Sequence, residues 1–490
     1  MDGGNLEDSV FLALRSKENE VAQTDTLFLE GSSVKKERIF RRVEVRMKED
    51  ILDTSIPVLG KPKVPSPIAS INDPLRSRSF VSDNERILLN ILEHEVVEGI
   101  EAGKKCLSFE RAGPRKRIYF DPSKLRCAIV TCGGLCPGIN DIIRAIVLEL
   151  YHVYKVKNIV GIRYGLQGFI PKYGHDVIEL TPDIVSHIHE MGGTILGSSR
   201  GPQDIGEIVD ALERMNVGLL FAIGGDGTLK AATRIVDEIL ERGLKISVIG
   251  IPKTIDNDIY MVERSFGFST AVEVATHAIR SAHIEALGFP NGIGLLKLMG
   301  RNSGFIAATA TLALRDVNFV LIPESDFDLE GPNGLLEALK RRLLERKHAV
   351  IVVAEGAGQK FFGNNKEERD ASGNIRLKDI GQFLKDAILE YFNQEGMEVN
   401  LKYIDPSYMI RSLPANTSDN IFCGFLGQSA VHAGMAGKTK MLVSSLNNHL
   451  VHVPMHLSAG RQKRVDLKGK LWLSVLETTG QPSLKNERDD

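Results

Sequence analysis

The sequence contains few cysteines and no long apolar run. Its 490 residues include five cysteines and a single tryptophan. So few thiols in a chain of this length exclude a disulfide-rich scaffold and favour a reduced, intracellular protein. No apolar stretch approaches the ~20 residues that a membrane-spanning helix needs. We therefore expect neither a secreted disulfide domain nor a membrane partner.

The sequence also lacks an excess of charge of either sign. Its net charge is -2, with 25% charged and 43% hydrophobic residues, as in a soluble globular protein. This balance does not favour nucleic acid over small molecules as partners. The acidic N-terminus has no apolar segment typical of a signal peptide, and the C-terminus lacks a peroxisomal tripeptide, so we expect a cytoplasmic location.

The length predicts more than one hydrophobic core. Residues 1 to about 115 are dense in charge and proline, which favours an extension over the surface with one helix near 85–100. A partner-binding or regulatory role for this segment is the alternative. The C-terminal residues 476–490 are expected to form a tail.

From residue 125 on, short apolar runs alternate with helical patterns, which is typical of parallel, doubly wound sheets. The predicted strands are 127–131, 159–162, 217–223, 246–251, 292–298, 319–322 and 349–354. The predicted helices are 140–150, 181–192, 226–243, 271–283, 335–346 and 380–392. Thr181-Pro182-Asp183 is a strong helix start because it combines a cap, a first-turn proline and an acid.

Three glycine-rich segments predict phosphate binding, because glycine exposes backbone N–H groups at a loop or helix start. They are 133–134, 197–201 and 224–228. A tight turn is the alternative for any one of them. Gly434-Met-Ala-Gly437-Lys438-Thr439 has too few residues between its glycines for a P-loop, and residue 230 is lysine where a dinucleotide fingerprint needs a third glycine.

Carboxylates follow two of the predicted strands. Asp226 lies within Gly224-Gly-Asp-Gly-Thr228, and Asp256 and Asp258 lie within Pro252-Lys-Thr-Ile-Asp-Asn-Asp258. Phosphoryl transfer needs Mg²⁺ to neutralise the phosphates and a carboxylate to accept the proton of the attacking hydroxyl. Asp256 and Asp258 as turn residues that bind their own backbone are the structural alternative.

Four motifs in this order resemble the signature set of the 6-phosphofructokinases. They are 224–228, 252–258, Met299-Gly300-Arg301 and Lys402-Tyr-Ile-Asp-Pro-Ser-Tyr-Met-Ile-Arg411. The N-terminal extension and Lys253 are similar to the plant and trypanosomatid branch. The resemblance covers about 115–475. It implies an α/β fold with two doubly wound, Rossmann-like domains: an ATP domain at 116–268, completed by part of 412–475, and a fructose 6-phosphate domain at 269–411.

The resemblance also implies a role for each motif residue. Asp256 is the expected base, with Lys253, Thr254, Asp258 and Arg301 around the reacting groups, and Asp226 is the expected Mg²⁺ ligand. The residues implied for the ATP phosphates are Gly133, Gly134, Arg200, Gly225, Asp226, Gly227 and Thr228. The residues implied for fructose 6-phosphate are Thr254, Asp256, Met299, Gly300, Arg301, Glu355, Lys402, Tyr408 and Arg411.

The phosphoryl donor depends on two residues. In the family, glycine at the position of Gly227 accompanies ATP, whereas aspartate there accompanies pyrophosphate. Lys253 resembles the pyrophosphate-dependent members, but the plant and trypanosomatid ATP enzymes combine both residues. We therefore expect ATP. The alternatives are a pyrophosphate-dependent enzyme, a catalytically silent subunit that binds sugar phosphate, and another Gly-Gly-Asp-Gly kinase acting on a lipid or on NAD.

Two positions depart from the bacterial pattern. Gly292 stands where a neighbouring subunit supplies an arginine, and Gly165-Leu166-Gln167-Gly168 replaces a loop with a tyrosine at the position of Leu166. The resemblance further implies a homo-oligomer, tetrameric by family analogy, and allosteric control whose effectors the sequence does not identify.

Overall fold

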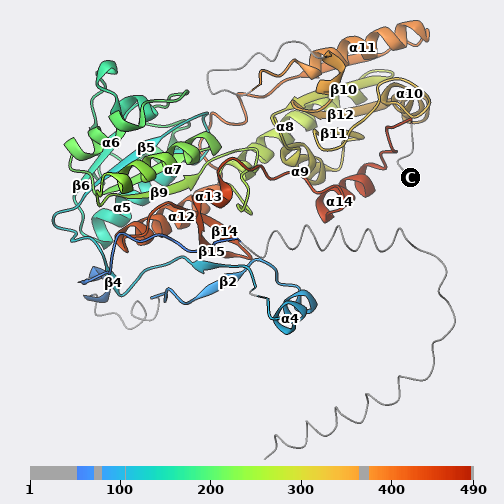
Figure 1. Ribbon diagram of the computed structural model, residues 1–490. Coiled ribbons are helices and arrows are strands. Elements are labelled where there is room, and N and C mark those ends of the chain that lie inside the picture. The colour runs from blue at the N-terminus through green and yellow to red at the C-terminus, as the bar shows by residue number, and fades with distance from the viewer. Residues whose placement is uncertain (1–51, 71–79, 105, 364–374, 487–490) are drawn as a thin grey trace, which may run out of the picture.

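The computed structural model describes residues 52–70, 80–104, 106–363 and 375–486. Two sheets stand side by side, one in each half of the molecule (Figure 1). None of the helices within these ranges is both long and apolar enough to span a bilayer. Residues 1–51 of the predicted N-terminal extension lie outside the described residues, so the structure does not address the role predicted for them.

The first sheet has nine strands in the order β2-β3-β15-β14-β9-β8-β5-β6-β7, and its centre from β14 to β6 is parallel. The outer strands pair antiparallel. Its strands are β2 (Arg86–Leu88), β3 (Ser108–Arg111), β5 (Arg126–Thr131), β6 (Asn158–Ile162), β7 (Ile178–Glu179), β8 (Leu219–Gly224), β9 (Ser247–Pro252), β14 (Met441–Leu446) and β15 (His449–Pro454).

Helices cover both faces of this sheet, because successive strand residues point to opposite sides and both sets are apolar. One face packs against α5 (Ile139–Leu148) and α12 (Thr417–Met435), and the other against α6 (Ile205–Arg214) and α7 (Asp226–Glu241). Four short elements lie around it: β1 (Val64–Pro65), β4 (Arg117–Ile118), α4 (Glu93–Glu101) and α13 (Met455–Ser458). Strand β1 pairs with β4.

The second sheet has four parallel strands in the order β11-β12-β10-β13. They are β10 (Gly292–Leu298), β11 (Phe319–Leu321), β12 (His348–Ala354) and β13 (Asn400–Ile404). One face packs against α8 (Phe268–Leu287) and α9 (Phe305–Leu314), and the other against α10 (Leu335–Arg346) and α11 (Ile380–Gln394). The last helix, α14 (Lys470–Thr479), packs on α9. The predicted α/β class with two doubly wound sheets is confirmed.

The helix predicted over 181–192 is wrong. This stretch forms turns, with one short 3-10 helix at Ile188–Glu190. The Thr181 Oγ1 accepts a hydrogen bond from the Ile184 N–H (3.4 Å), and the Ser186 Oγ donates to the Asp183 carbonyl (2.7 Å). The first bond is that of a helix cap, but the second gives the backbone an alternative to the helical ladder, and the chain continues in turns.

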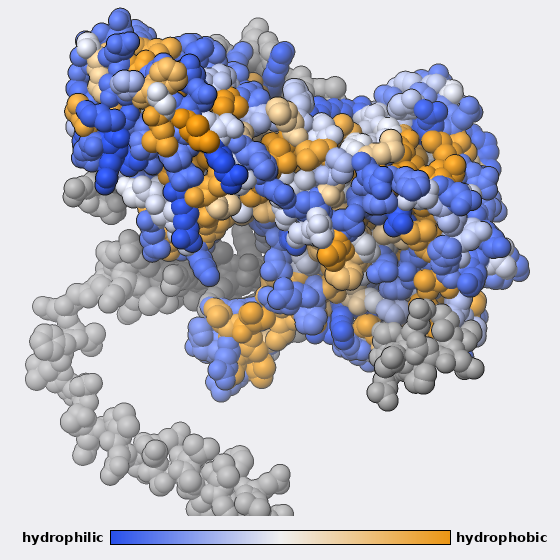
Figure 2. Space-filling model, turned by 180° about the vertical axis from the view of Figure 1, so that it is seen from behind, coloured by the Kyte–Doolittle hydropathy of each residue, from blue (hydrophilic) through white to orange (hydrophobic). Residues whose placement is uncertain are grey.

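The single helix predicted near 85–100 is also wrong in its first half. Residues Arg86–Leu88 form strand β2, and α4 begins only after Leu92. The Asn90 Oδ1 accepts from the Leu92 N–H (2.9 Å) and turns the chain between them. Figure 2 shows apolar side chains gathered on the part of the molecule that protrudes at α4. The exposed apolar residues there are Ile91, Leu92, Val97 and Ile100.

A buried group of charged side chains joins strand β3 to its neighbours in the first sheet. Glu110 on β3 accepts hydrogen bonds from Arg115 (2.5 Å) and Lys438 (3.0 Å), and lies 3.0 Å from the His452 Nδ1 on β15. Burial opposes the charge of Glu110, but its polar partners, first His452 and then Lys438, outweigh that effect and lower its pKa to about 2. Strand β3 is therefore anchored in the sheet.

We expect Glu110→Gln to lower the free energy of unfolding by about 3 kcal/mol, because Lys438 and Arg115 lose their buried counter-charge and keep only the exposed Asp83. Urea unfolding at pH 7 measures this, with Glu98→Gln on the exposed side of α4 as the control. Since the pKa of Glu110 is lowered from 4.5 to about 2, its contribution is complete above 4.5 and is lost as pH falls towards 2. Equal stability of the two variants would contradict the account.

Candidate active site

The two acidic loops leave the first sheet at the same edge. Strands β8 and β9 are parallel neighbours, with Gly224 paired to Pro252 at their carboxyl ends. The Lys253 N–H donates to the Gly224 carbonyl (3.0 Å), so the second loop starts against the first. Ligands of open α/β sheets bind at this edge.

Three cationic side chains converge on the glycine loop after β5. The buried Lys253 Nζ donates to the Gly134 carbonyl (2.7 Å). A Cβ placed on Gly134 would lie 3.3 Å from an Arg411 nitrogen and 3.6 Å from an Arg200 nitrogen. Burial lowers the pKa of Lys253, and Arg411 and Arg200 lower it further, while the Cys136 and Cys132 thiols act the other way. Such a group of cations around bare backbone suits a phosphate chain.

Gly133 carries the turn that opens this loop. Its φ is +84°, a region that favours glycine. The Ser198 Oγ donates to its carbonyl (2.6 Å), which ties the loop to the 197–201 segment. Two of the three predicted glycine segments therefore touch.

The carboxylate of Asp256 is buried beside charges of both signs. Burial raises its pKa well above the usual 3.8, and Asp258 and Glu355 raise it further, while Arg301 and Arg411 act the other way. Its Oδ1 has no hydrogen-bond partner among the described residues. A buried acceptor without a partner costs free energy in the folded protein, so this oxygen is a candidate contact for a bound hydroxyl.

Thr254 and Asp258 hold the turn around Asp256. The Asp256 N–H donates to the Thr254 Oγ1 (3.1 Å), and that hydroxyl donates to the Asp258 Oδ1 (3.0 Å). Burial raises the pKa of Asp258, and the charge of Asp226 adds to that effect. The two acidic loops therefore act on each other electrostatically.

Asp226 begins α7, next to Gly225 at the helix cap. Its carboxylate accepts from the Gly460 N–H (2.5 Å) and pairs with the Lys230 Nζ (2.7 Å). The described residues contain no group of three or more His, Cys, Asp or Glu that could hold a metal. A carboxylate has about four lone-pair positions, so Asp226 can still supply one ligand. Mg²⁺ commonly takes one or two carboxylates and completes its shell with phosphate and water.

Gly227 and Thr228 follow in the first turn of α7 and differ in their surroundings. A Cβ on Gly227 would meet no atom within 4 Å, and the backbone has an ordinary φ. Packing therefore does not require glycine at 227. Thr228 is buried against Gly224, where a Cβ would lie 2.1 Å from the Thr228 Oγ1.

The second sheet brings its own loops to the same place. Met299, Gly300 and Arg301 follow β10, and Glu355 follows β12, whose last residue pairs with Leu298. The Arg301 guanidinium donates to the Ile375 carbonyl (2.6 Å). Burial raises the pKa of Glu355, while Arg301 lowers it. The Ser303 Oγ donates to the Asp256 carbonyl (3.2 Å), which joins this loop to the acidic loop.

Two predicted sugar contacts are placed differently from the rest. Lys402 on β13 pairs with Gly294 in the middle of β10, and its Nζ lies 5.2 Å from the Phe289 ring centre. The structure does not bring Lys402 to the other site residues of its own chain. Tyr408 is 73% exposed, and its ring centre lies 5.0 Å from the Arg411 guanidinium carbon.

The two departures from the bacterial pattern have structural counterparts. A Cβ on Gly292 would lie 2.0 Å from the Ala286 carbonyl oxygen, so no arginine fits there. Leu166 lies in the 3-10 helix Gly165–Phe169 and is buried. The neighbouring Tyr164 is exposed beside His175, with ring centres 4.6 Å apart.

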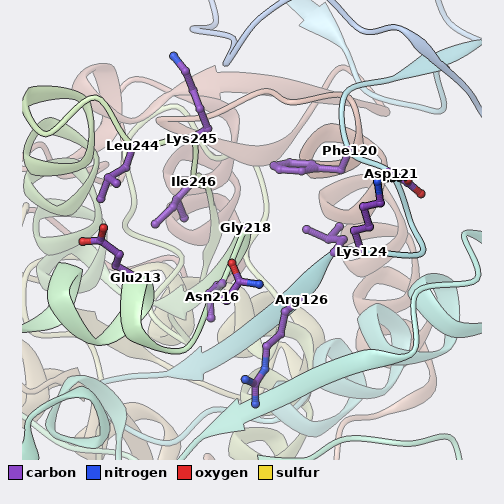
Figure 3. Close-up of a pocket in the computed structure, with 12 residues that line it drawn as sticks. Phe120, Asp121, Lys124, Arg126, Glu213, Asn216, Gly218, Leu244, Lys245 and Ile246 are labelled. Carbon is purple, nitrogen blue, oxygen red and sulfur yellow. Dashed lines mark ion pairs between the residues drawn. The ribbon is translucent and has the colours of Figure 1, made fainter.

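The sequence did not point to Ser303, Gly460 or Lys463, although each donates a hydrogen bond to an acidic loop. Ser303 lies two residues after the Met-Gly-Arg motif and is the one that its position could have indicated. A separate pocket of about 290 Å³ lies at the amino ends of β5, β8 and β9 (Figure 3). It contains none of the predicted site residues. Its lining includes Phe120, Lys124, Arg126, Gly218, Lys245 and Ile246.

Comparison with known proteins places this geometry in one family. The phosphofructokinase family model matches residues 126–434. An ATP-dependent 6-phosphofructokinase of Borreliella burgdorferi is 50% identical over 450 residues, which cover 90% of this chain and 100% of that protein. ATP-dependent 6-phosphofructokinase 7 of Arabidopsis thaliana is 48% identical, covering 79% and 80%. The ATP-dependent enzyme of Trypanoplasma borreli is 47% identical, covering 77% of each.

Solved structures share the fold at low identity. A pyrophosphate-dependent phosphofructokinase from Marinobacter aquaeolei superposes with a TM-score of 0.60 at 18% identity, covering 75% of this chain and 94% of that one. Pichia pastoris phosphofructokinase in the T-state gives 0.56 at 22% identity, covering 69% and 35%. The family model spans more than half of the 490 residues, and the curated relatives span most of them. The chain therefore belongs to the phosphofructokinase family.

Proposed function

We propose that this protein is an ATP-dependent 6-phosphofructokinase, which transfers the γ-phosphoryl group of MgATP to the 1-hydroxyl of fructose 6-phosphate and forms fructose 1,6-bisphosphate in glycolysis. The observation that carries the proposal is the buried Asp256 carboxylate, whose Oδ1 has no partner among the described residues. It lies in the electrostatic reach of Arg301 and Glu355 from the second sheet and of Arg411. The names of the curated relatives support the same activity.

In this proposal Asp256 accepts the proton of the 1-hydroxyl as that oxygen attacks phosphorus. Its raised pKa makes it a stronger base than an exposed aspartate, which suits proton transfer near neutral pH. Lys253, Arg200 and the glycine loop bind the phosphates of the donor. Arg301, Glu355 and the Met299-Gly300 loop bind the sugar, together with Arg411. Catalysis then rests on positioning and charge neutralisation.

Mg²⁺ is proposed to bind at Asp226, with Asp258 nearby. When bound, the cation would neutralise the charge that develops on the transferred phosphoryl group. The position of Asp226 in the first turn of α7, beside Asp258, supports this assignment.

The open space around Gly227 supports ATP over pyrophosphate. Packing does not require glycine there, so the space left by the missing side chain is available to the larger donor. Lys253 is compatible with either donor, because its ammonium faces the glycine loop. Retention of Asp226, Asp256 and Arg301 argues against a catalytically silent subunit.

We also propose a homo-oligomer. Lys402 lies beside Phe289, away from its own chain's site, so it would reach a sugar phosphate from a neighbouring copy. Exposed apolar side chains at the end of α8, just after it, and on α12 offer surfaces for such contacts. They are Ile284, Leu287, Phe289, Ile421 and Phe425.

The division of the chain at about 115, 268, 411 and 475 is kept as a proposal. The two sheets support it, although β2 and β3, from the predicted extension, join the first sheet. The cytoplasmic location likewise remains a proposal. The relative from Borreliella burgdorferi fits it, whereas two Arabidopsis relatives are named chloroplastic.

We expect Asp256→Ala to lower kcat by ~10²–10⁴, the range of general-base contributions, while the protein stays folded. An aldolase-coupled assay with ATP, Mg²⁺ and fructose 6-phosphate measures kcat, and circular dichroism checks the fold. Asp237→Ala, on the exposed side of α7, is the control and should match the wild type. Turnover of Asp256→Ala near the wild-type value would refute the assignment.

We expect Gly227→Asp to keep its thermal midpoint within ~1 °C of the wild type, since the side chain enters open space. The same variant should lose at least about tenfold in kcat/KM for ATP, because a carboxylate next to the donor repels and crowds the nucleotide phosphates. Parallel assays with ATP and pyrophosphate decide. An unchanged kcat/KM for ATP, or comparable wild-type rates with both donors, would contradict our interpretation of Gly227.

A further inference from the structure

The segment from Ser458 to Val465 crosses the outside of both acidic loops. The Ser458 Oγ donates to the Tyr260 carbonyl (2.7 Å), and the Gly460 N–H donates to the Asp226 carboxylate (2.5 Å). The Lys463 N–H donates to the Asp258 carbonyl (2.7 Å). Figure 1 shows the chain passing here from α13, in the first half of the molecule, to α14 beside the second sheet. We call residues 458–465 the strap.

The side chain of Lys463 is directed into the protein. Its Nζ donates to the Val262 carbonyl (2.6 Å) and the Glu263 carbonyl (3.0 Å), and lies 5.0 Å from the Phe305 ring centre. Burial lowers its pKa to about 8, while Asp258 and Glu263 act the other way. The backbone N–H of Lys463 therefore binds Asp258, and its ammonium binds residues 262 and 263. This one residue contacts both ends of the segment that follows Asp256.

Glu324 continues the connection to the second sheet. Its carboxylate accepts from the Gly304 N–H (3.1 and 3.0 Å to its two oxygens) and from the Val465 N–H (2.8 Å). Gly304 follows Ser303, whose hydroxyl donates to the Asp256 carbonyl. Hydrogen bonds and short backbone segments therefore form a closed ring. Its members, in order, are Asp256, Asp258, Lys463, Val465, Glu324, Gly304 and Ser303.

We propose that Lys463 and Glu324 are positioning residues that fix the Asp256 loop against the Met299-Gly300-Arg301 loop. Neither residue needs to touch substrate. Each acts through a loop that carries a predicted substrate contact. The kinetic consequence rests on the proposed kinase activity, whereas the effect on loop order does not. A displacement of about 1 Å between base and acceptor is enough to cost up to ~10² in rate.

The test compares Lys463→Met with Lys468→Met, a change at an exposed lysine five residues further along the chain. Lys463→Met keeps the apolar stem and the backbone bond to Asp258, and removes only the bonds of the ammonium to the Val262 and Glu263 carbonyls. We expect Lys463→Met to lower kcat by about 10- to 100-fold with KM for ATP and for fructose 6-phosphate changed less than about threefold. Lys463→Arg keeps a cationic donor and should recover most of the kcat. Lys468→Met should match the wild type.

Glu324→Gln is the second variant and keeps the side-chain volume, so it serves if Lys463→Met does not fold. Its amide has one acceptor oxygen in place of two, and it should show the same loss of kcat at nearly constant KM. The double variant should lose less than the product of the two single losses, since both changes loosen the same pair of loops. Fluorescence of the single tryptophan, Trp472, which is buried in α14, reports whether the fold is intact.

Hydrogen exchange separates the proposal from the kinase activity. We expect faster amide exchange at 254–263 and 299–304 in Lys463→Met, and unchanged exchange there in Lys468→Met. This result in a protein without kinase activity would overturn the proposed function and leave the loop coupling standing. Three results would overturn the coupling. They are equal exchange in both variants, a kcat of Lys463→Met within about twofold of the wild type, and a red-shifted Trp472 emission that accompanies the loss of activity.

Discussion

The burial of the Asp256 carboxylate is the constraint on which the site depends. An ionised carboxylate taken out of water is costly unless hydrogen bonds and opposite charges compensate for it. Asp256 has cationic neighbours in Arg301 and Arg411, but also two acidic ones, and its Oδ1 is left without a partner among the described residues. This arrangement keeps the base reactive but lowers the stability of the protein, and the rest of the fold compensates for that loss.

The two sheets supply that stability by meeting at their carboxyl ends. Strands β8 and β9 are buried along their whole length, and so are nearly all residues of β10 and β12. Their loops are therefore held by rigid cores on both sides. The loops carry charges of opposite sign to a common point, with Lys253 and Arg200 at the glycine loop and acids on the loops after β8 and β9. An anionic donor and a neutral hydroxyl fit between them.

The sequence predicted the central part of this arrangement because its signals are local. An apolar run followed by glycine and aspartate identifies a strand end and a loop, and parallel pairing then brings Asp226 and Asp256 to one edge. Signals that depend on distant partners were missed. The strap contacts Asp226 from 234 residues away in the sequence, and no motif near Gly460 predicts this contact. The helix expected from Thr181 did not form: its cap bond is present, but the Ser186 hydroxyl binds the Asp183 carbonyl and the chain continues in turns. Lys402 was assigned by the resemblance alone, and its contact with the sugar phosphate stays a prediction, now for a neighbouring copy of the chain.

The most direct test of the central claim is the pH dependence of kcat/KM for fructose 6-phosphate in the wild type and in Glu355→Gln. The base must be ionised, so activity falls as pH drops through the pKa of Asp256, which burial raises well above 3.8. Removal of the Glu355 charge lowers that pKa, so the acidic limb of Glu355→Gln should move to lower pH. An acidic limb near pH 4 in the wild type, or a limb that stays in place or moves to higher pH in Glu355→Gln, would contradict the account.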